Sequence, residues 1–271
     1  MQRITIHQSD LEKLKIKLND SKYLEYIWHK FLDNPNATWS EDILKKNKNW
    51  SYPDCWLTRY YTYYDNCKNF IENKKILDIG SCFSFYSAWA ILNGASHVDC
   101  IEPSKLKSEL AKEYIKIRKL DTQITIKNLD IEYYFNNETV KNYDTVFYLD
   151  VFEYMVNPVL SLELIKTKIN PKYIFFESGV ADDLSHNNSG YLNIWTPSVD
   201  EKKLDSTINI KNFTTKRLAF KPTRKALSTM FEYLNFEIIK YFDYADVSFK
   251  NMHSQPRKEG KKVFYLLKNN S

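Results

Sequence analysis

The sequence is poor in glycine, with five glycines in 271 residues, about 2% against roughly 7% in average usage. A loop that holds the pyrophosphate of a dinucleotide uses three glycines within six residues, directly after a strand. In this chain only Gly80 stands in such a window. The scarcity of glycine therefore argues against an NAD- or FAD-binding site.

Cysteine and long apolar runs are also scarce. The four cysteines are scattered, with no CxxC pair and no histidine at zinc-site spacing, so we expect neither a disulfide framework nor a metal site. No run of 18 or more apolar residues occurs, and the first 20 residues carry charges throughout. We therefore predict a soluble, cytoplasmic protein without a membrane partner.

The charge balance is mild. Against 39 basic residues stand 34 acidic ones, which gives a formal net charge of +5. That surplus is compatible with an anionic substrate but is below the imbalance expected of a dedicated nucleic-acid binder.

Two regions of different texture follow each other along the chain. Residues 1–70 have helical apolar spacing, and we interpret them as a helical N-terminal extension. From residue 71 to residue 271, short apolar runs alternate with helical segments. This pattern predicts a doubly wound α/β fold: a mainly parallel, seven-stranded sheet with an antiparallel last strand. A long polar stretch, residues 179–221, is expected to form an insert on the substrate side. Strands are expected at residues 74–79, 97–102, 123–128, 143–151, 172–178, 236–244 and 261–268, with helices over 84–93, 105–119, 159–168 and 222–236.

The most informative stretch is the first strand and the turn after it. The strand ends in Asp78, Gly80 follows in the turn, and Glu102 lies near the end of the next strand, 22 positions after Gly80. An acidic side chain at about this offset can accept hydrogen bonds from both hydroxyls of a ribose. A glycine in the turn lets a ligand approach the backbone. Together they favour a site for a nucleoside-containing ligand.

At this point the sequence resembles the class I S-adenosylmethionine-dependent methyltransferases, whose first motif is an apolar strand ending D-x-G-x-G-x-G. Here Cys82 and Ser84 stand at the later glycine positions. The resemblance implies S-adenosylmethionine as cofactor. It also makes the residues of this turn candidate donor contacts, namely Asp78, Gly80, Ser81, Cys82 and Phe83.

Further parts of the family pattern follow in order. Glu102 and Pro103 resemble the acidic motif that holds the ribose, and Asp130 and Ile131 fall where the family binds adenine. Residues 143–158 resemble the fourth-strand block, which places Asp150 and Val151 at the donor and puts Tyr154 where histidine is common. Arg59 is a candidate partner for the methionine carboxylate, with a surface arginine or an ion pair in the core as the alternative.

Methyl transfer asks mainly for alignment of the acceptor and, for a hydroxyl acceptor, removal of a proton. Candidate bases are His186 in the insert, Tyr154 after the fourth strand and Glu177 at the end of the fifth. For each of them a non-catalytic role is the alternative. His186 could instead be an exposed loop histidine, and the other two residues could only shape the pocket.

The insert mixes aromatic and cationic side chains, among them Trp195 and Arg217. Such a mixture suits a nucleotide, a sugar nucleotide or an RNA strand, and equally the solvated face of a lysine-rich protein. Residues 217–240 resemble a region of the methyltransferases related to those that modify wobble uridine in tRNA. The preferred hypothesis is methyl transfer to a small or medium polar acceptor at oxygen. The alternatives are an RNA-modifying methyltransferase and a catalytically degenerate binding subunit.

Overall fold

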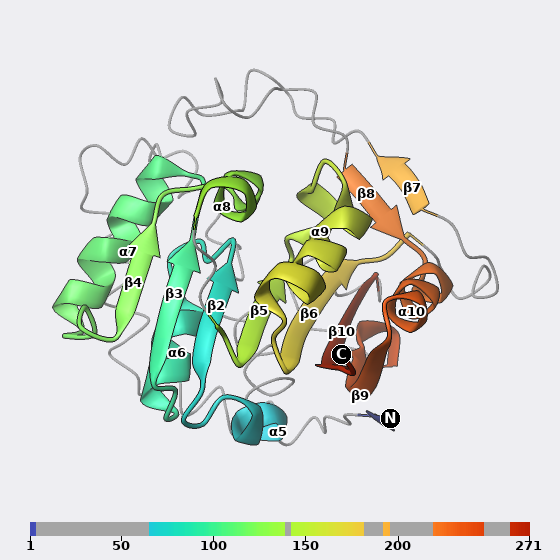
Figure 1. The fold of residues 1–271 in the computed structure, drawn as a ribbon, viewed down its shortest axis with the longest axis horizontal. Coiled ribbons are helices and arrows are strands. Elements are labelled where there is room, and N and C mark those ends of the chain that lie inside the picture. The colour runs from blue at the N-terminus through green and yellow to red at the C-terminus, as the bar shows by residue number, and fades with distance from the viewer. Residues whose placement is uncertain (4–64, 139–141, 182–191, 196–218, 247–260) are drawn as a thin grey trace.

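The computed structural model describes residues 1–3, 65–138, 142–181, 192–195, 219–246 and 261–271 (Figure 1). In these ranges the strands form an eight-stranded sheet and a separate two-stranded sheet. The predicted extension lies mostly outside them, so the boundary near residue 70 stays a prediction. Within the same ranges, no helix combines the length and apolar character needed to cross a bilayer.

Five parallel strands form the larger part of the large sheet. In spatial order they are β4 (Ile124–Lys127), β3 (His97–Ile101), β2 (Lys75–Ile79), β5 (Thr145–Leu149) and β6 (Tyr173–Gly179). Their order reverses between β2 and β5, which is where open α/β sheets bind ligands at the carboxyl ends of the strands. This arrangement confirms the predicted doubly wound sheet.

Next to β6 the sheet continues with strands from the end of the chain. The last strand, β10 (Lys262–Asn269), runs antiparallel to both of its neighbours, β6 and β9 (Phe236–Asp243). The prediction of an antiparallel last strand is thus confirmed. Outside β9 lies β1 (Gln2–Arg3), which pairs with it in parallel.

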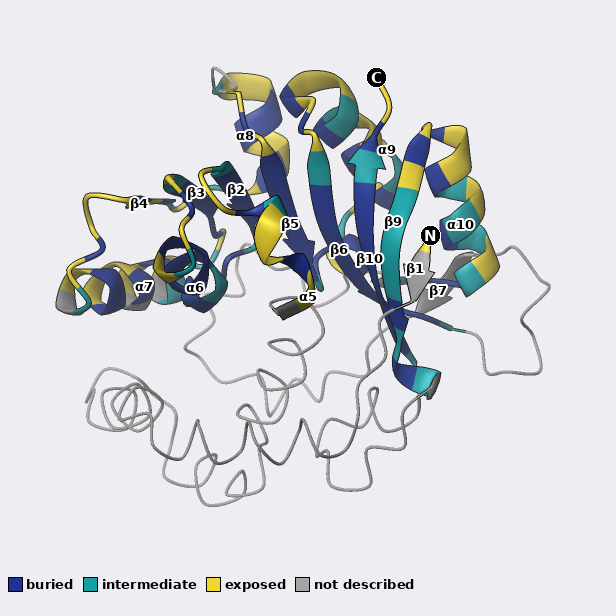
Figure 2. Ribbon diagram, turned by 90° about the horizontal axis from the view of Figure 1, so that it is seen from below, coloured by how far each residue is buried: buried dark blue, intermediate teal, exposed yellow. Residues whose placement is uncertain are grey.

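Both faces of the sheet are covered by helices, and the strand sequences show why. Every residue of β5 is buried, with Val146 and Tyr148 in one hydrophobic cluster and Phe147 and Leu149 in the other. Side chains alternate between the faces of a strand, so an uninterrupted apolar run needs cover on both sides. Figure 2 shows the helices above and below the sheet. One cluster includes α6 (Phe85–Leu92) and α7 (Lys105–Ile117), and the other includes α8 (Ile131–Asn137), α9 (Pro158–Leu164) and α10 (Arg224–Tyr233).

The structure differs from the sequence-based expectation in three places. The strand β1 lies in a region where we expected helices. Part of the predicted polar insert forms β7 (Leu192–Trp195), which pairs with β8 (Ala219–Pro222). Pro222 was expected in the first turn of a helix, but it ends β8, and α10 begins two residues later. The reason is Thr223, whose hydroxyl accepts a hydrogen bond from Ala226 N at 3.1 Å and caps the helix.

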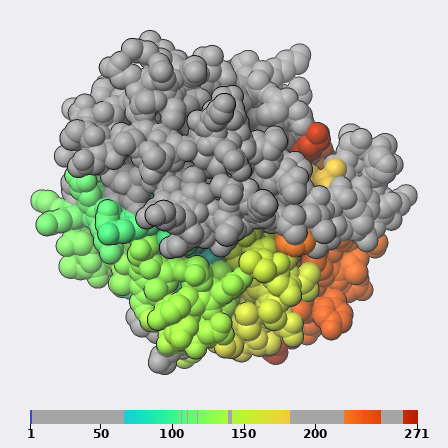
Figure 3. Space-filling view, turned by 90° about the horizontal axis from the view of Figure 1, so that it is seen from above, coloured from blue at the N-terminus to red at the C-terminus, as the bar shows by residue number. Residues whose placement is uncertain are grey.

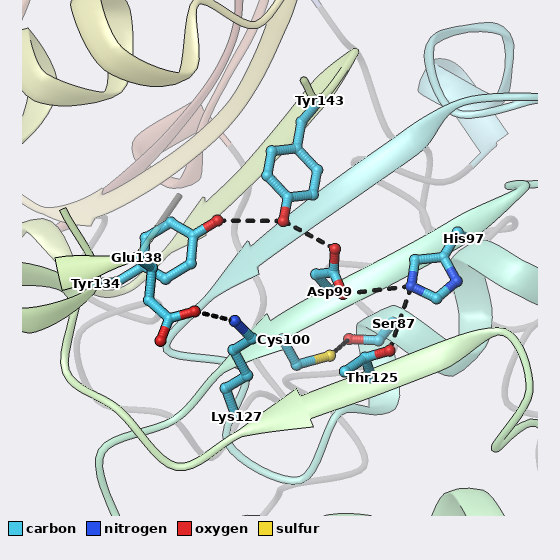
Figure 4. A network of polar contacts seen from close by, with 9 residues as sticks. All are labelled: Ser87, His97, Asp99, Cys100, Thr125, Lys127, Tyr134, Glu138 and Tyr143. Carbon is cyan, nitrogen blue, oxygen red and sulfur yellow. Dashed lines mark hydrogen bonds and ion pairs between the residues drawn. The ribbon is translucent and has the colours of Figure 1, made fainter. Parts of the chain in front are cut away.

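A buried polar network joins β3, α8 and the start of β5 (Figure 4). The hydroxyl of Tyr143 donates to Asp99 Oδ2 at 2.8 Å and lies 3.2 Å from the hydroxyl of Tyr134. Asp99 Oδ1 lies 3.3 Å from Nε2 of His97. Burial, with Tyr134 and Asp99 nearby, raises the pKa of Tyr143, so it stays a neutral donor. The network satisfies a carboxylate that is 2% exposed.

Candidate active site

The loop between β2 and α6 has an alternating backbone. Gly80, Cys82 and Ser84 have φ angles of +68°, +53° and +57°, all in the left-handed region. For a residue with a Cβ this conformation costs about 1–2 kcal/mol. The loop therefore takes up left-handed conformations at all three positions where the family motif has glycine, although two of them carry side chains here.

Gly80 is needed for its packing as well as for its φ angle. A Cβ on Gly80 would lie 2.6 Å from Cγ2 of Val151, so no larger residue fits without a shift. Val151 thus fills the space on the side of Gly80 where a Cβ would point. The contact joins the loop after β2 to the loop after β5, and it brings two predicted donor contacts together.

Glu102 connects the loop after β2 to the turn after β3. It is 4% exposed, and its two carboxylate oxygens accept one backbone N–H each, from Cys82 and from Ser104, both at 2.8 Å. Burial raises the pKa of Glu102, and the charge of Lys107 opposes that rise. A carboxylate oxygen has two lone pairs, so each oxygen can accept a further hydrogen bond.

Asp78 helps to hold the loop between β2 and α6 in place. It is 2% exposed and accepts a hydrogen bond from the hydroxyl of Ser87 at 2.5 Å. The same hydroxyl lies 3.1 Å from Sγ of Cys100. The hydrogen bond from Ser87 to Asp78 therefore ties β2 to α6. Ser87 was not among the predicted site residues, although its place at the start of the helix after the loop is a signal that the sequence offers.

The loops after β3 and β4 carry the next predicted donor contacts. Asp130 caps α8, with Oδ1 accepting from Tyr133 N at 2.6 Å, while Ile131 is buried in the core. Pro103 is exposed in the turn after β3. Sequence reasoning missed Asn128, whose side-chain amide donates to the carbonyl oxygens of Glu102 at 2.9 Å and Pro103 at 3.0 Å. It fixes the turn that carries the acidic residue.

The loop after β5 contains a further left-handed residue, Asp150, with φ of +59°. Lys262, at the start of β10, forms an ion pair with Asp150 Oδ1, and its Nζ lies 3.6 Å from Oε1 of Glu177. Sequence reasoning missed Lys262, which stands 112 residues after Asp150 and outside any motif.

The predicted catalytic residues are placed differently from one another. Glu177 is fully buried beside Lys262. Tyr154, in the short helix η3 (Phe152–Tyr154), is 46% exposed at the same end of the sheet. His186 and Arg59 lie outside the described residues. Figure 3 views the molecule from this end and shows α8 and α9 next to each other at the surface.

The fold has many counterparts among solved structures of methyltransferases. A 1,6-didemethyltoxoflavin-N1-methyltransferase from Burkholderia thailandensis has a TM-score of 0.54 at 10% identity, and the match covers 90% of each chain. A structure described as a putative S-adenosylmethionine-dependent methyltransferase from Listeria monocytogenes has a TM-score of 0.51 at 11% identity, over 77% of this chain and 98% of the other. The architecture is therefore that of the Rossmann-like S-adenosylmethionine-dependent methyltransferases.

Sequence comparison gives narrower matches. No family model matches the chain. Two curated relatives, both ribosomal RNA small subunit methyltransferase G from Prochlorococcus marinus, are similar to parts of it. One is 34% identical over 84 residues, which cover 29% of this chain and 35% of the relative. The other is 29% identical over 164 residues, which cover 58% of this chain and 61% of the relative. The chain thus spans less than two thirds of either relative.

Proposed function

We propose that this chain transfers a methyl group from S-adenosylmethionine to a polar acceptor. The observation that carries the proposal is the placement of Glu102 beside the left-handed loop from Gly80 to Ser84, on a methyltransferase fold. A buried carboxylate with remaining acceptor capacity fits the two hydroxyls of a ribose. The bound donor would supply an electrophilic methyl group on a sulfonium.

The chain's own residues would bind and orient this donor. Glu102 would accept hydrogen bonds from the ribose hydroxyls, and the turn from Asp78 to Phe83 would lie along the donor. Asp130 and Ile131 would be placed at the adenine, and Asp150 and Val151 beside the part that carries the sulfonium. Arg59 would pair with the methionine carboxylate.

The acceptor we propose is a hydroxyl of a small or medium polar molecule, such as a saccharide, a sugar nucleotide or a nucleoside. Its proton would have to be removed, and His186, Tyr154 and Glu177 are the candidate bases. The exposure of Tyr154 at the carboxyl ends of the strands supports it as a residue that meets the acceptor. The burial of Glu177 beside Lys262 supports a positioning role for that residue instead.

A second candidate acceptor is RNA. This candidate is supported by the two curated relatives, whose name describes them as methyltransferases of ribosomal RNA. Binding that depends on phosphate contacts weakens steeply with salt. An affinity for RNA that stays flat between low and physiological salt would refute this candidate. Transfer of a labelled methyl group to RNA, but not to a panel of sugars and nucleosides, would select it.

The donor site can be tested by calorimetric titration with S-adenosylmethionine and S-adenosylhomocysteine. We expect Glu102→Ala to weaken both at least tenfold, because a hydrogen bond to a charged group contributes about 1.5–3 kcal/mol. The matched control is Glu109→Ala, which removes an exposed glutamate on α7. Absence of wild-type binding at millimolar donor would refute the enzyme. Donor binding without transfer to any acceptor would instead favour a degenerate binding subunit, and an unchanged affinity in Glu102→Ala would refute this placement of the site.

A further inference from the structure

Charged side chains lie together at the carboxyl ends of β5 and β6, and all of them except the partly exposed Asp150 are buried. Lys262 is 7% exposed and contacts Asp150 and Glu177, which is fully buried. Glu153 is 6% exposed, and its Oε2 lies where a Cβ on Gly179 would come within 2.5 Å of it. These three carboxylates and Lys262 are called the Lys262 cluster below.

The Lys262 cluster is tied to the proposed donor loop through the backbone. Asp150 N donates to the carbonyl oxygen of Glu177 at 2.9 Å, which joins the ends of β5 and β6. The next residue, Val151, packs against Gly80. A ligand bound along the loop after Gly80 would therefore lie close to the cluster.

We propose that the Lys262 cluster makes the site distinguish the positively charged sulfonium of the donor from the neutral thioether of the product. This inference rests on the proposed function. The carboxylates favour the cation, and Lys262 limits that preference while it holds Asp150 and Glu177 in place. The distinction matters because transfer leaves the C–S electron pair on sulfur, so the donor loses its positive charge when the methyl group leaves.

The size of the effect follows from Coulomb's law. For separations of about 8–10 Å and an effective dielectric of about 20–40, one unit charge changes the affinity for a cation by about 4- to 30-fold. The thioether sulfur of the product lacks this charge, and the ammonium and carboxylate groups that donor and product share contribute equally to both affinities. A merely structural change would weaken both ligands alike, so the ratio of the two dissociation constants isolates the charge effect.

The test is titration of the full chain with S-adenosylmethionine and S-adenosylhomocysteine at one salt concentration. In Lys262→Met we expect the preference for the sulfonium to rise by about 4- to 30-fold. In Glu177→Gln, which keeps the shape of the side chain, we expect it to fall by a similar factor. The matched control is Lys268→Met, which removes a lysine from the same strand, where Lys268 pairs with Glu237 at 3.0 Å in an exposed position. We expect its ratio to equal that of the wild type.

Ratios within twofold of the wild type in both Lys262→Met and Glu177→Gln would overturn the proposal while leaving the proposed function intact. If Lys262→Met does not fold, Glu177→Gln and Glu153→Gln decide the question. A wild-type chain that binds neither ligand fails at the proposed function itself, which is a separate and recognisable result.

Discussion

Replacing Gly80 with alanine tests whether the loop after β2 is fixed by its backbone and by Val151. An alanine at this position would have to adopt a φ of +68°, a left-handed conformation that costs a residue with a Cβ about 1–2 kcal/mol. It would also meet Cγ2 of Val151 at 2.6 Å, and overpacking of this kind costs about 1–3 kcal/mol. Alanine also lowers the conformational entropy of the unfolded chain, which stabilises the folded state by about 0.4–1 kcal/mol. We therefore expect Gly80→Ala to lower the free energy of unfolding by roughly 3 kcal/mol.

A double-mutant cycle with Val151→Ala separates the two causes. Shortening Val151 removes the overlap but leaves the backbone strain, so the double variant should be more stable than the two single effects added together predict. The difference should be about 1–3 kcal/mol. Urea denaturation followed by circular dichroism measures all four proteins. A coupling below about 0.5 kcal/mol, which is within ordinary additivity, would refute the contact, and an unchanged stability in Gly80→Ala would refute both causes.

Three further outcomes are expected. Tyr143→Phe should cost about 1–3 kcal/mol in urea denaturation, because it removes the hydrogen bond that the Tyr143 hydroxyl donates to a buried oxygen of Asp99; an unchanged midpoint would contradict the network. Burial raises the pKa of Glu153, so the folded state holds this proton more tightly than the unfolded state, and stability is lost as the pH rises from its usual value through the raised one. Glu153→Gln should therefore gain stability relative to the wild type as the pH rises above 4.5, and a constant difference would contradict the shift. A thiol reagent should label Cys82, which is half-buried, before Cys67, because burial raises the pKa of Cys67 to about 12; peptide mass spectrometry gives the order, and the reverse order would be evidence against the placement of the loop.

Much of the central sheet could be predicted because its signals are local. The apolar run 74–79 became β2, and the run 143–151 contains β5, whose residues are buried on both faces. The left-handed conformations of Cys82 and Ser84 were not foreseen from their residue types. Only their position in the motif pointed to them, since Gly80 is the one residue of the three that favours such a φ.

The parts that escaped prediction depend on distant partners. A strand of two residues such as β1 has no periodicity, and it exists only because β9 offers an edge. Lys262 is the first residue of β10, and nothing near it in sequence reveals the carboxylates that it contacts. In the insert, β7 pairs with β8 although residues 196–218 separate them in sequence. A local sequence pattern cannot predict such a pairing.

The pairing of β1 with β9 also sets an order of events. Gln2 lies opposite Lys240, so a chain made from its amino end completes β2 to β6 before the partner of β1 exists. Closing so long a loop comes late and yields little contact. The first residues of the chain should thus be the last to join the sheet and the first to leave it. Their amide hydrogens should exchange with solvent faster than those of β10, which has a neighbour on each side.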